Sequence, residues 1–159
     1  MARRSTPPEA HRLEHRVVIA APRDDVWALV EDPDALMTWV HGLRSVTAAN
    51  GMPGGFALGA TFVQRVRIGL VATACRGEVT AFVPLSSLAV VVHHALFDLD
   101  IEYQFAAAGR GTEVACKAAV HGRALGTVIP RAKVEAVTSA LLAEHLAALQ
   151  ALAEGSSTR

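Results

Sequence analysis

The side chain best suited to chemistry in this sequence is a tyrosine in a strongly alternating run. Tyr103 lies between Ile101 and Phe105, with polar residues at the intervening positions. This pattern predicts a strand with one apolar face, so the phenol points inward and must find a hydrogen-bond partner. Protein, water and ligand all remain open as that partner. An inward hydroxyl beside a ligand oxygen could also exchange a proton with it.

His94 is the second candidate for proton transfer, because imidazole ordinarily titrates near neutrality. Leu88, Val90 and Val92 define an inward phase that includes His94 and turns His93 outward. Val91 is also apolar, which leaves the phase open, and the pattern favours His94 over His93. Adjacent strand residues point to opposite faces, so the two histidines cannot easily share one metal ion.

Two more polar residues fall on predicted inward faces. His15 shares the phase of Ile19 in the first strand, where it contacts ligand or is satisfied by a neighbour or water at the sheet margin. The phase that buries Phe62 turns Gln64 inward, either to orient a ligand or to bond to the next strand. The same phase sends Arg65 and Arg67 to solvent.

Motifs of common catalytic and cofactor sites are absent from the sequence. It contains no His-Glu-x-x-His, Cys-x-x-Cys, Gly-x-Gly-x-x-Gly, Walker or Gly-x-Ser-x-Gly pattern. Its 7 histidines have no shared spacing that assembles a metal site. We therefore expect no metal and no cofactor.

Composition narrows the functional classes further. The 159 residues carry 15 basic and 15 acidic side chains spread along the chain, which disfavours nucleic acid as a partner. The apolar run from Leu85 to Phe97 is too short and too interrupted to cross a membrane. We expect a cytoplasmic protein with Cys75 and Cys116 reduced. Homodimerisation remains open.

The elements that position these residues follow from changes in periodicity. A strand stops at Pro22, a helix covers Pro22 to Val30, and a second helix is capped by Asp32 and stops before Gly42. An antiparallel meander follows from Leu43 to Arg123, with turns that include Asn50-Gly51, Pro84-Leu85-Ser86 and Gly109-Arg110-Gly111. A long amphipathic helix from about Thr127 to Glu154 ends at Gly155. We expect residues 1–10 to be a disordered tail, 11–154 one domain, and 155–159 a loose end.

Small residues on the inward strand faces indicate unfilled space beneath the long helix. Cys75, Gly77, Cys116 and Ala118 share the inward phases, and short side chains leave volume that neither layer fills. The alternative is that the alanine-rich helix approaches the sheet closely at these positions. We expect a ligand-sized cavity between the sheet and the helix.

Several short motifs together resemble one known superfamily. They are Ile19-Ala20-Ala21-Pro22 followed by Val26-Trp27, Asp32-Pro33 followed by Trp39, Gly59-Ala60-Thr61-Phe62, the spacing of Val79 and Pro84, and Gly111-Thr112-Glu113-Val114. Their order is similar to that of the helix-grip superfamily, often labelled SRPBCC, which includes START domains, the birch pollen allergen and bacterial polyketide cyclases. The resemblance implies an α+β fold in which a curved antiparallel sheet of about seven strands wraps around a long C-terminal helix. Two short helices follow its first strand.

The resemblance also implies a ligand held between sheet and helix. We expect the catalytic groups to come from Tyr103, His94 and His15. The ligand-binding residues expected are Trp39, Phe62, Gln64, Val79, Phe97, Leu99, Ile101, Cys116, Val134, Thr138 and Leu141.

Three functions fit this reading. The first is a polyketide cyclase-like enzyme that moves a proton in an aldol-type or dehydrative ring closure. Cyclases of the superfamily tend to place arginine in the cavity, and no arginine here clearly faces inward. The second is a non-catalytic carrier or sensor of a lipid, quinone or other hydrophobic metabolite. The third is an interaction module that assists chaperones.

Overall fold

The computed structural model describes residues 12–48, 56–68, 70–95, 97–122 and 130–157. The predicted tail at residues 1–10 and the predicted turn at Asn50-Gly51 lie outside these ranges. The elements in chain order are β1 (Arg12–Ile19), α1 (Arg23–Glu31), α2 (Pro33–Trp39), β2 (Leu43–Ala48), β3 (Thr61–Ile68), β4 (Val71–Val83), β5 (Ser87–His93), β6 (Phe97–Ala108), β7 (Gly111–Gly122) and α3 (Arg131–Ser157).

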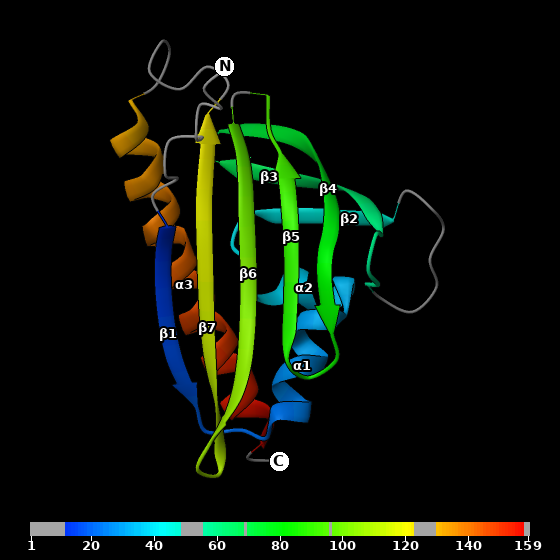
Figure 1. The fold of residues 1–159 in the computed structure, drawn as a ribbon, viewed down its shortest axis with the longest axis vertical. Coiled ribbons are helices and arrows are strands. Elements are labelled where there is room, and N and C mark those ends of the chain that lie inside the picture. Colours follow the sequence, from blue (N-terminus) through cyan, green and yellow to red (C-terminus); the bar gives the residue numbers. More distant parts are fainter. Residues whose placement is uncertain (1–11, 49–55, 69, 96, 123–129, 158–159) are drawn as a thin grey trace, which may run out of the picture.

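The strands form one 7-stranded antiparallel sheet in the order β1-β7-β6-β5-β4-β3-β2. The chain meanders from β2 to β7, and β1 then pairs with β7 through a register that includes His15 opposite Cys116. The long helix α3 crosses behind the sheet and packs against β1, β7 and both short helices (Figure 1). This is the predicted helix-grip arrangement, and it leaves the inner face of the remaining strands open toward a cavity.

The two short helices begin and end as their sequences predict. Asp32 caps α2 by accepting a hydrogen bond from the Asp34 amide, and Pro33 is the first helical residue. The indole of Trp39 donates to the backbone oxygen of Leu29 at 2.8 Å. This bond ties the end of α2 to α1 and fixes the start of the loop that leads to β2.

Two sharp turns connect the longest strands. Leu85 has a φ of 64° between β4 and β5, and Gly109 has a φ of 59° between β6 and β7. Both are in the left-handed region, which suits the glycine but strains the leucine. The predicted turns at Pro84-Leu85-Ser86 and Gly109-Arg110-Gly111 are confirmed.

The long helix departs from the prediction at its C-terminal end. It continues to Ser157, past Gly155, because Gly155 does not adopt the left-handed backbone that ends many helices. The predicted start at Thr127 lies outside the described residues. Within the described part of the chain, α3 is the one helix long and apolar enough to cross a membrane. Its packing against the sheet is consistent with the central helix of a soluble protein.

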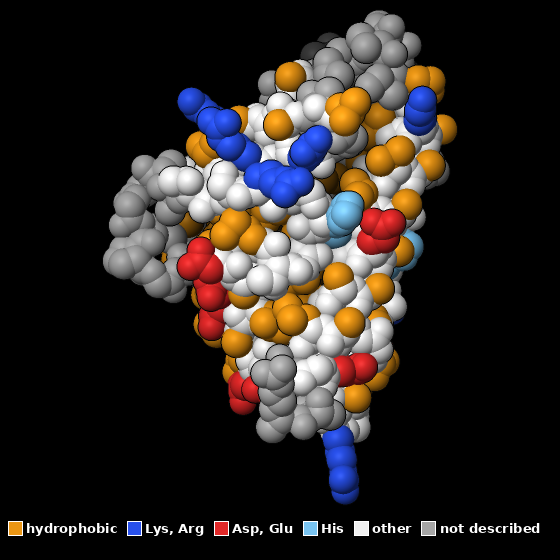
Figure 2. All heavy atoms as spheres, turned by 180° about the vertical axis from the view of Figure 1, so that it is seen from behind, with side chains coloured by type: hydrophobic (Ala, Val, Ile, Leu, Met, Phe, Trp, Pro, Cys, Tyr) orange, Lys and Arg blue, Asp and Glu red, His pale blue; other side chains and the backbone are white. Residues whose placement is uncertain are grey.

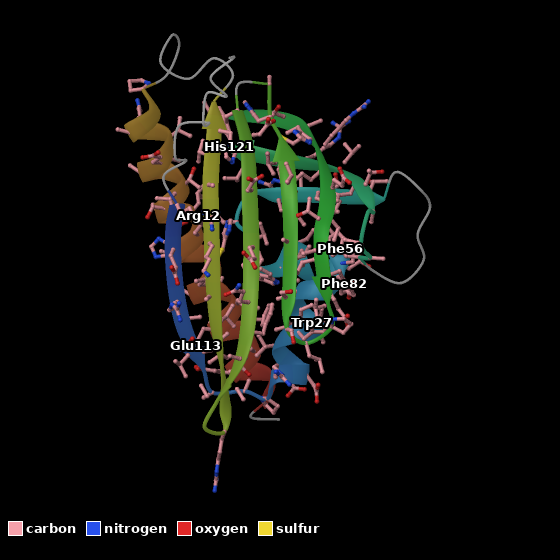
Figure 3. All side chains as sticks on the ribbon, viewed as in Figure 1. Arg12, Trp27, Phe56, Phe82, Glu113 and His121 are labelled. Carbon is pink, nitrogen blue, oxygen red and sulfur yellow. The ribbon has the colours of Figure 1, made fainter. Side chains whose placement is uncertain are left out.

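Several polar side chains on the outer face of the sheet pair with one another. Arg16 contacts Glu14 and Glu113, His93 bonds to Asp98 at 2.9 Å, and His121 bonds to Asp100 at 2.8 Å. Figure 3 shows His121 toward the same end of the sheet as Arg12 of β1, and Glu113 toward the opposite end of β7. The inner face is apolar, so the alternation predicted for these strands is confirmed.

Candidate functional site

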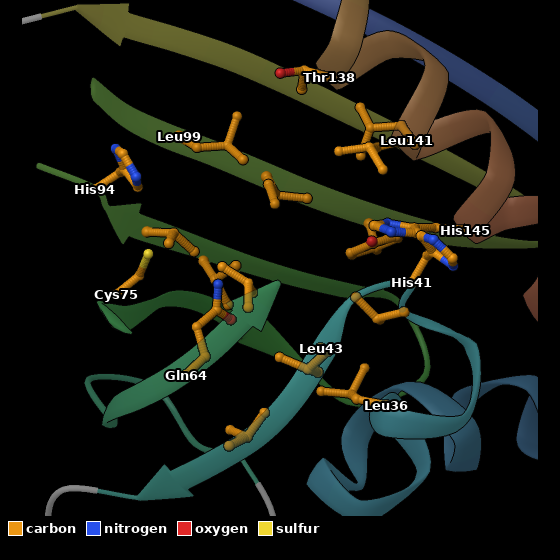
Figure 4. Close-up of a pocket in the computed structure, with 18 of the residues that line it drawn as sticks. Leu36, His41, Leu43, Gln64, Cys75, His94, Leu99, Thr138, Leu141 and His145 are labelled. Atoms are coloured by element: carbon orange, nitrogen blue, oxygen red, sulfur yellow. The ribbon is translucent and has the colours of Figure 1, made fainter. Parts of the chain in front are cut away.

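A pocket of about 650 Å³ lies between the inner face of the sheet, α2 and α3. Phe62, Phe97, Leu99 and Ile101 contribute from the strands, and α3 contributes further aliphatic side chains (Figure 4). The predicted cavity between sheet and helix is therefore present. The predicted lining residues found in its wall are Phe62, Gln64, Phe97, Leu99, Ile101, Val134, Thr138 and Leu141.

His94 lies in the wall of this pocket. It follows directly after β5, and its ring stacks on Phe97 with the centroids 4.6 Å apart and the planes at 21°. The neighbouring His93 is exposed and bonds to Asp98 on the outer face. The preference for His94 over His93 as the inward residue is confirmed, while a catalytic role for His94 remains a prediction.

Tyr103 also lines the pocket, but its hydroxyl already has a protein partner. The residue is 8% exposed, and its hydroxyl forms a hydrogen bond with the thiol of Cys116, its register partner on β7. Burial and the neighbouring Cys116 raise the pKa of Tyr103 well above its ordinary value. Burial raises the pKa of Cys116 to about 12, an effect that the bond from Tyr103 partly offsets. The phenol is therefore a poor proton donor in the resting pocket.

Four predicted site residues lie outside the pocket wall. His15 bonds to Ser139 of α3 at 2.9 Å, between β1 and the helix, where the two elements pack closely. Val79 and Cys116 are fully buried in the core, with Cys116 next to the Tyr103 hydroxyl. Trp39 packs edge-on against Tyr103 at 6.0 Å and is 2% exposed. The sequence pattern predicted that these residues are buried, but it could not show which neighbour would cover each of them.

The small residue Gly77 does not create space in the pocket. Gly77 lies opposite Phe62, and an added Cβ at Gly77 would lie 2.2 Å from Phe62 Cζ. The aromatic ring thus fills the space that the glycine vacates. The expectation that this volume belongs to the pocket is wrong at Gly77, and also at Cys116 and Ala118, which are buried outside the pocket wall. Of the four small residues, Cys75 does line the pocket.

Two histidines that strand and helix periodicity did not mark as site residues lie in the pocket wall. The His145 ring on α3 bonds to the backbone of His41, in the loop between α2 and β2, and Figure 4 shows the two side chains together. Burial lowers the pKa of His145, so its neutral form is favoured. Its Nε2 is buried without a hydrogen-bond partner among the described residues. The one sequence feature that could have indicated this site is the position of His145 within the apolar stripe of α3.

The remaining polar groups of the wall are few. Gln64 and Thr138 lie on opposing elements, one on β3 and one on α3. Arg65 and Arg67 are both exposed, as predicted, but Arg67 also borders the pocket. Among the described residues, no group of His, Cys, Asp and Glu side chains is arranged to hold a metal ion. Lys133 and Glu144 of α3 also line the pocket. The wall can therefore hold a largely apolar molecule and offer it imidazole and amide groups, with charged side chains at Arg67, Lys133 and Glu144.

The fold and this pocket define a helix-grip protein that binds hydrophobic ligands. Residues 10–154 match the family model described as polyketide cyclase/dehydrase and lipid transport, and the chain belongs to that family. No curated protein matches the sequence.

Solved structures with the same fold are distant in sequence. The Zhui aromatase/cyclase from Streptomyces sp. R1128 superposes with a TM-score of 0.75 at 18% identity, covering 92% of this chain and 94% of that one. A START superfamily protein from Mycobacterium smegmatis gives 0.76 at 15% identity, covering 91% and 98%. The di-domain aromatase/cyclase StfQ of the steffimycin pathway gives 0.77 at 15% identity over 93% of this chain, which spans 52% of StfQ. At these identities the likeness shows the fold alone.

Proposed function

We propose that the protein is a polyketide cyclase-like enzyme that closes a ring in a flexible, carbonyl-rich and largely apolar substrate. The observation that carries this proposal is the imidazole of His94 in the wall of a largely apolar pocket, stacked on Phe97. A confined pocket favours the folded conformers of a flexible chain, which raises the rate of an intramolecular reaction. The aromatase/cyclases among the structural neighbours are consistent with this chemistry.

The proposed step uses one proton carrier and one hydrogen-bond donor. His94 removes a proton from a carbon between two carbonyl groups, and the resulting enolate attacks a second carbonyl of the same chain. This forms one carbon–carbon bond and an alkoxide, which takes the proton back from the imidazolium. The Gln64 amide is positioned in the same wall to donate to an oxygen as negative charge develops on it. Loss of water from the resulting alcohol completes a dehydrative closure.

A matched pair of histidine variants tests the proposal. With a synthetic poly-β-keto thioester as substrate, His94→Ala should lower the rate of cyclised product formation by about 100-fold, as for a positioned acid or base. His93→Ala should leave it unchanged, because His93 lies on the outer face bonded to Asp98. Product is followed by mass spectrometry, as loss of water from the substrate. Equal rates for wild type and His94→Ala would contradict the assignment of His94.

A non-catalytic carrier of a hydrophobic metabolite is the second candidate. It is favoured by the engagement of Tyr103 with Cys116 and of His15 with Ser139, which leaves few polar groups for chemistry. Native mass spectrometry of the purified protein separates the two candidates: a carrier returns its ligand unchanged, whereas an enzyme releases a product of altered mass. The enclosed pocket gives less support to a chaperone-assisting interaction module, which needs a surface and no cavity.

A further inference from the structure

The apolar pocket opens next to a second cavity of different chemistry. This second cavity, of about 600 Å³, lies between α2, the start of β2 and α3. The two share part of their walls, namely Val40, His41, Leu43, Arg67 and Glu144. The two cavities are therefore adjacent, and the second one, with its more polar wall, forms a mouth beside the apolar pocket.

Local backbone features place two arginines at this mouth. The ladder between β2 and β3 shifts register between Leu43 and Ser45, so Arg44 is the extra residue of a β-bulge. Leu43 then lines both cavities, and Arg44 lines the polar one. A bulge commonly re-aims a side chain in this way. Ordinary strand alternation could not have located this change.

Arg67 reaches the same mouth through a close backbone contact. Its amide donates to the Gly42 oxygen at 2.8 Å. Gly42 has a φ of 82°, and a Cβ there would lie 2.6 Å from the Arg67 carbonyl oxygen. Only glycine fits this left-handed and crowded position. Gly42 therefore holds the end of β3, and with it Arg67, against the loop that carries His41.

The second cavity has two basic side chains and one acidic side chain in its wall, Arg44, Arg67 and Glu144. The charged side chains that line the two cavities among the described residues are Arg44, Arg67, Lys133 and Glu144. Arg44 is exposed, and Glu144 is the one acidic group in the set. Figure 2 shows Lys and Arg side chains close together in the upper half of this face, with a histidine and acidic side chains beside them.

We propose that the ligand carries an anionic group at one end, which Arg44 and Arg67 bind at the mouth while its apolar chain fills the pocket. A guanidinium forms paired hydrogen bonds with carboxylate and phosphate oxygens, so either anion satisfies the site. The negative charge of Glu144 repels the anion and so weakens its binding by the two arginines. The inference rests on the proposed function only in requiring that the apolar pocket holds the ligand.

Three probes with the same chain test this anionic subsite. Dodecanoic acid, dodecyl phosphate and dodecanol are compared by displacement of the neutral dye Nile red at about pH 8, where the carboxylate is ionised. We expect at least one of the two anions to bind wild type about tenfold more tightly than the alcohol, as expected for a charge-assisted contact. The anion that loses more affinity in the arginine variants is the group the mouth recognises. Added salt should weaken the anion and leave the alcohol unchanged.

The variants are chosen to separate charge from structure. Arg44→Gln combined with Arg67→Gln should remove the preference for the anion and leave dodecanol binding intact. Arg65→Gln is the matched control, because Arg65 is exposed on the same strand and lines neither cavity. Glu144→Gln should strengthen anion binding by a few-fold. If Arg67→Gln does not fold, Arg44→Gln alone carries the test and should lose about half of the preference on a logarithmic scale.

The outcomes distinguish this inference from the proposed function. If dodecanol binds and neither anion is preferred, or if the preference survives both arginine substitutions, the anionic subsite is wrong and the apolar pocket stands. If Nile red binds but none of the probes displaces it, the subsite is wrong. If neither Nile red nor any of the probes binds, the hydrophobic-ligand function is overturned as well. Loss of cyclisation in His94→Ala with normal anion binding would leave both intact.

Discussion

The hydrogen bond between Tyr103 and Cys116 can be measured with a double-mutant cycle. Tyr103→Phe removes only the hydroxyl and keeps the ring against Trp39. It should lower the free energy of unfolding by about 0.5 to 1.5 kcal/mol, as expected for one lost hydrogen bond. Cys116→Ala removes a fully buried sulfur and should cost about 1 to 2 kcal/mol through lost burial and a small cavity.

The diagnostic quantity is the coupling between the two substitutions. Either single variant already breaks the bond, so the double variant should lose about 0.5 to 1 kcal/mol less than the sum of the singles. Urea unfolding followed by far-UV circular dichroism is the appropriate assay. Tryptophan fluorescence is unsuitable, because Trp39 contacts Tyr103 directly and its emission would change in the folded state.

Cys75→Ala provides the control for this cycle. Cys75 is also a buried thiol in a strand, but it is not among the groups that perturb Tyr103. Its effect should add to that of Tyr103→Phe within about 0.5 kcal/mol. Additivity between Tyr103→Phe and Cys116→Ala as well would refute the hydrogen bond. A loss well above 3 kcal/mol for Tyr103→Phe alone would show that the hydroxyl supports more of the core than this one bond.

Two further predictions concern neighbouring features. Gly77→Ala should destabilise the protein by about 2 to 3 kcal/mol, because the new methyl group overlaps the Phe62 ring; Phe62→Leu should relieve most of that loss in the double variant, as measured by thermal unfolding. The pKa of Cys116 rises from 9.0 to about 12 on folding, so the thiol holds its proton more tightly in the folded state. The resulting contribution to stability is complete below pH 9 and is lost as the pH rises toward 12. By about pH 10.5 the loss in the free energy of unfolding should reach roughly 2 kcal/mol. Measured by urea unfolding, the free energy of unfolding of Cys116→Ala should fall less steeply with pH than that of wild type; equal slopes would refute the assignment of this pH dependence to Cys116.

Periodicity predicted most of the fold because most strands alternate between buried apolar side chains and more exposed polar ones. The run around Tyr103 and the phase of His94 were predictable for this reason, and so was the cap at Asp32. Periodicity alone cannot predict which buried side chains contact one another. Phe62 lies over Gly77 and Tyr103 over Cys116, and both contacts depend on register between strands that the sequence does not reveal.

The mouth of the pocket was missed for a different physical reason. Arg44 is placed by a register shift and Arg67 by the close approach of Gly42, and neither feature follows strand alternation. His145 was hidden because it occupies a position in the apolar stripe of α3, where its spacing indicates burial and nothing more. Family resemblance supplied the cavity, but the polar groups around it had to come from the structure.

The pairing of β1 with β7 affects the order in which the molecule can be assembled during synthesis. The β1 strand leaves the ribosome before the other described strands, yet the strand that it pairs with is β7, through a register that joins Arg12 to Ala119. Contacts between such distant segments form slowly because a long loop must close first. The apolar inner face therefore stays uncovered until β7 and then α3 have been made, an interval in which it is prone to aggregation. A ligand that needs the finished pocket cannot guide these early steps, but it can trap the completed chain and slow its unfolding.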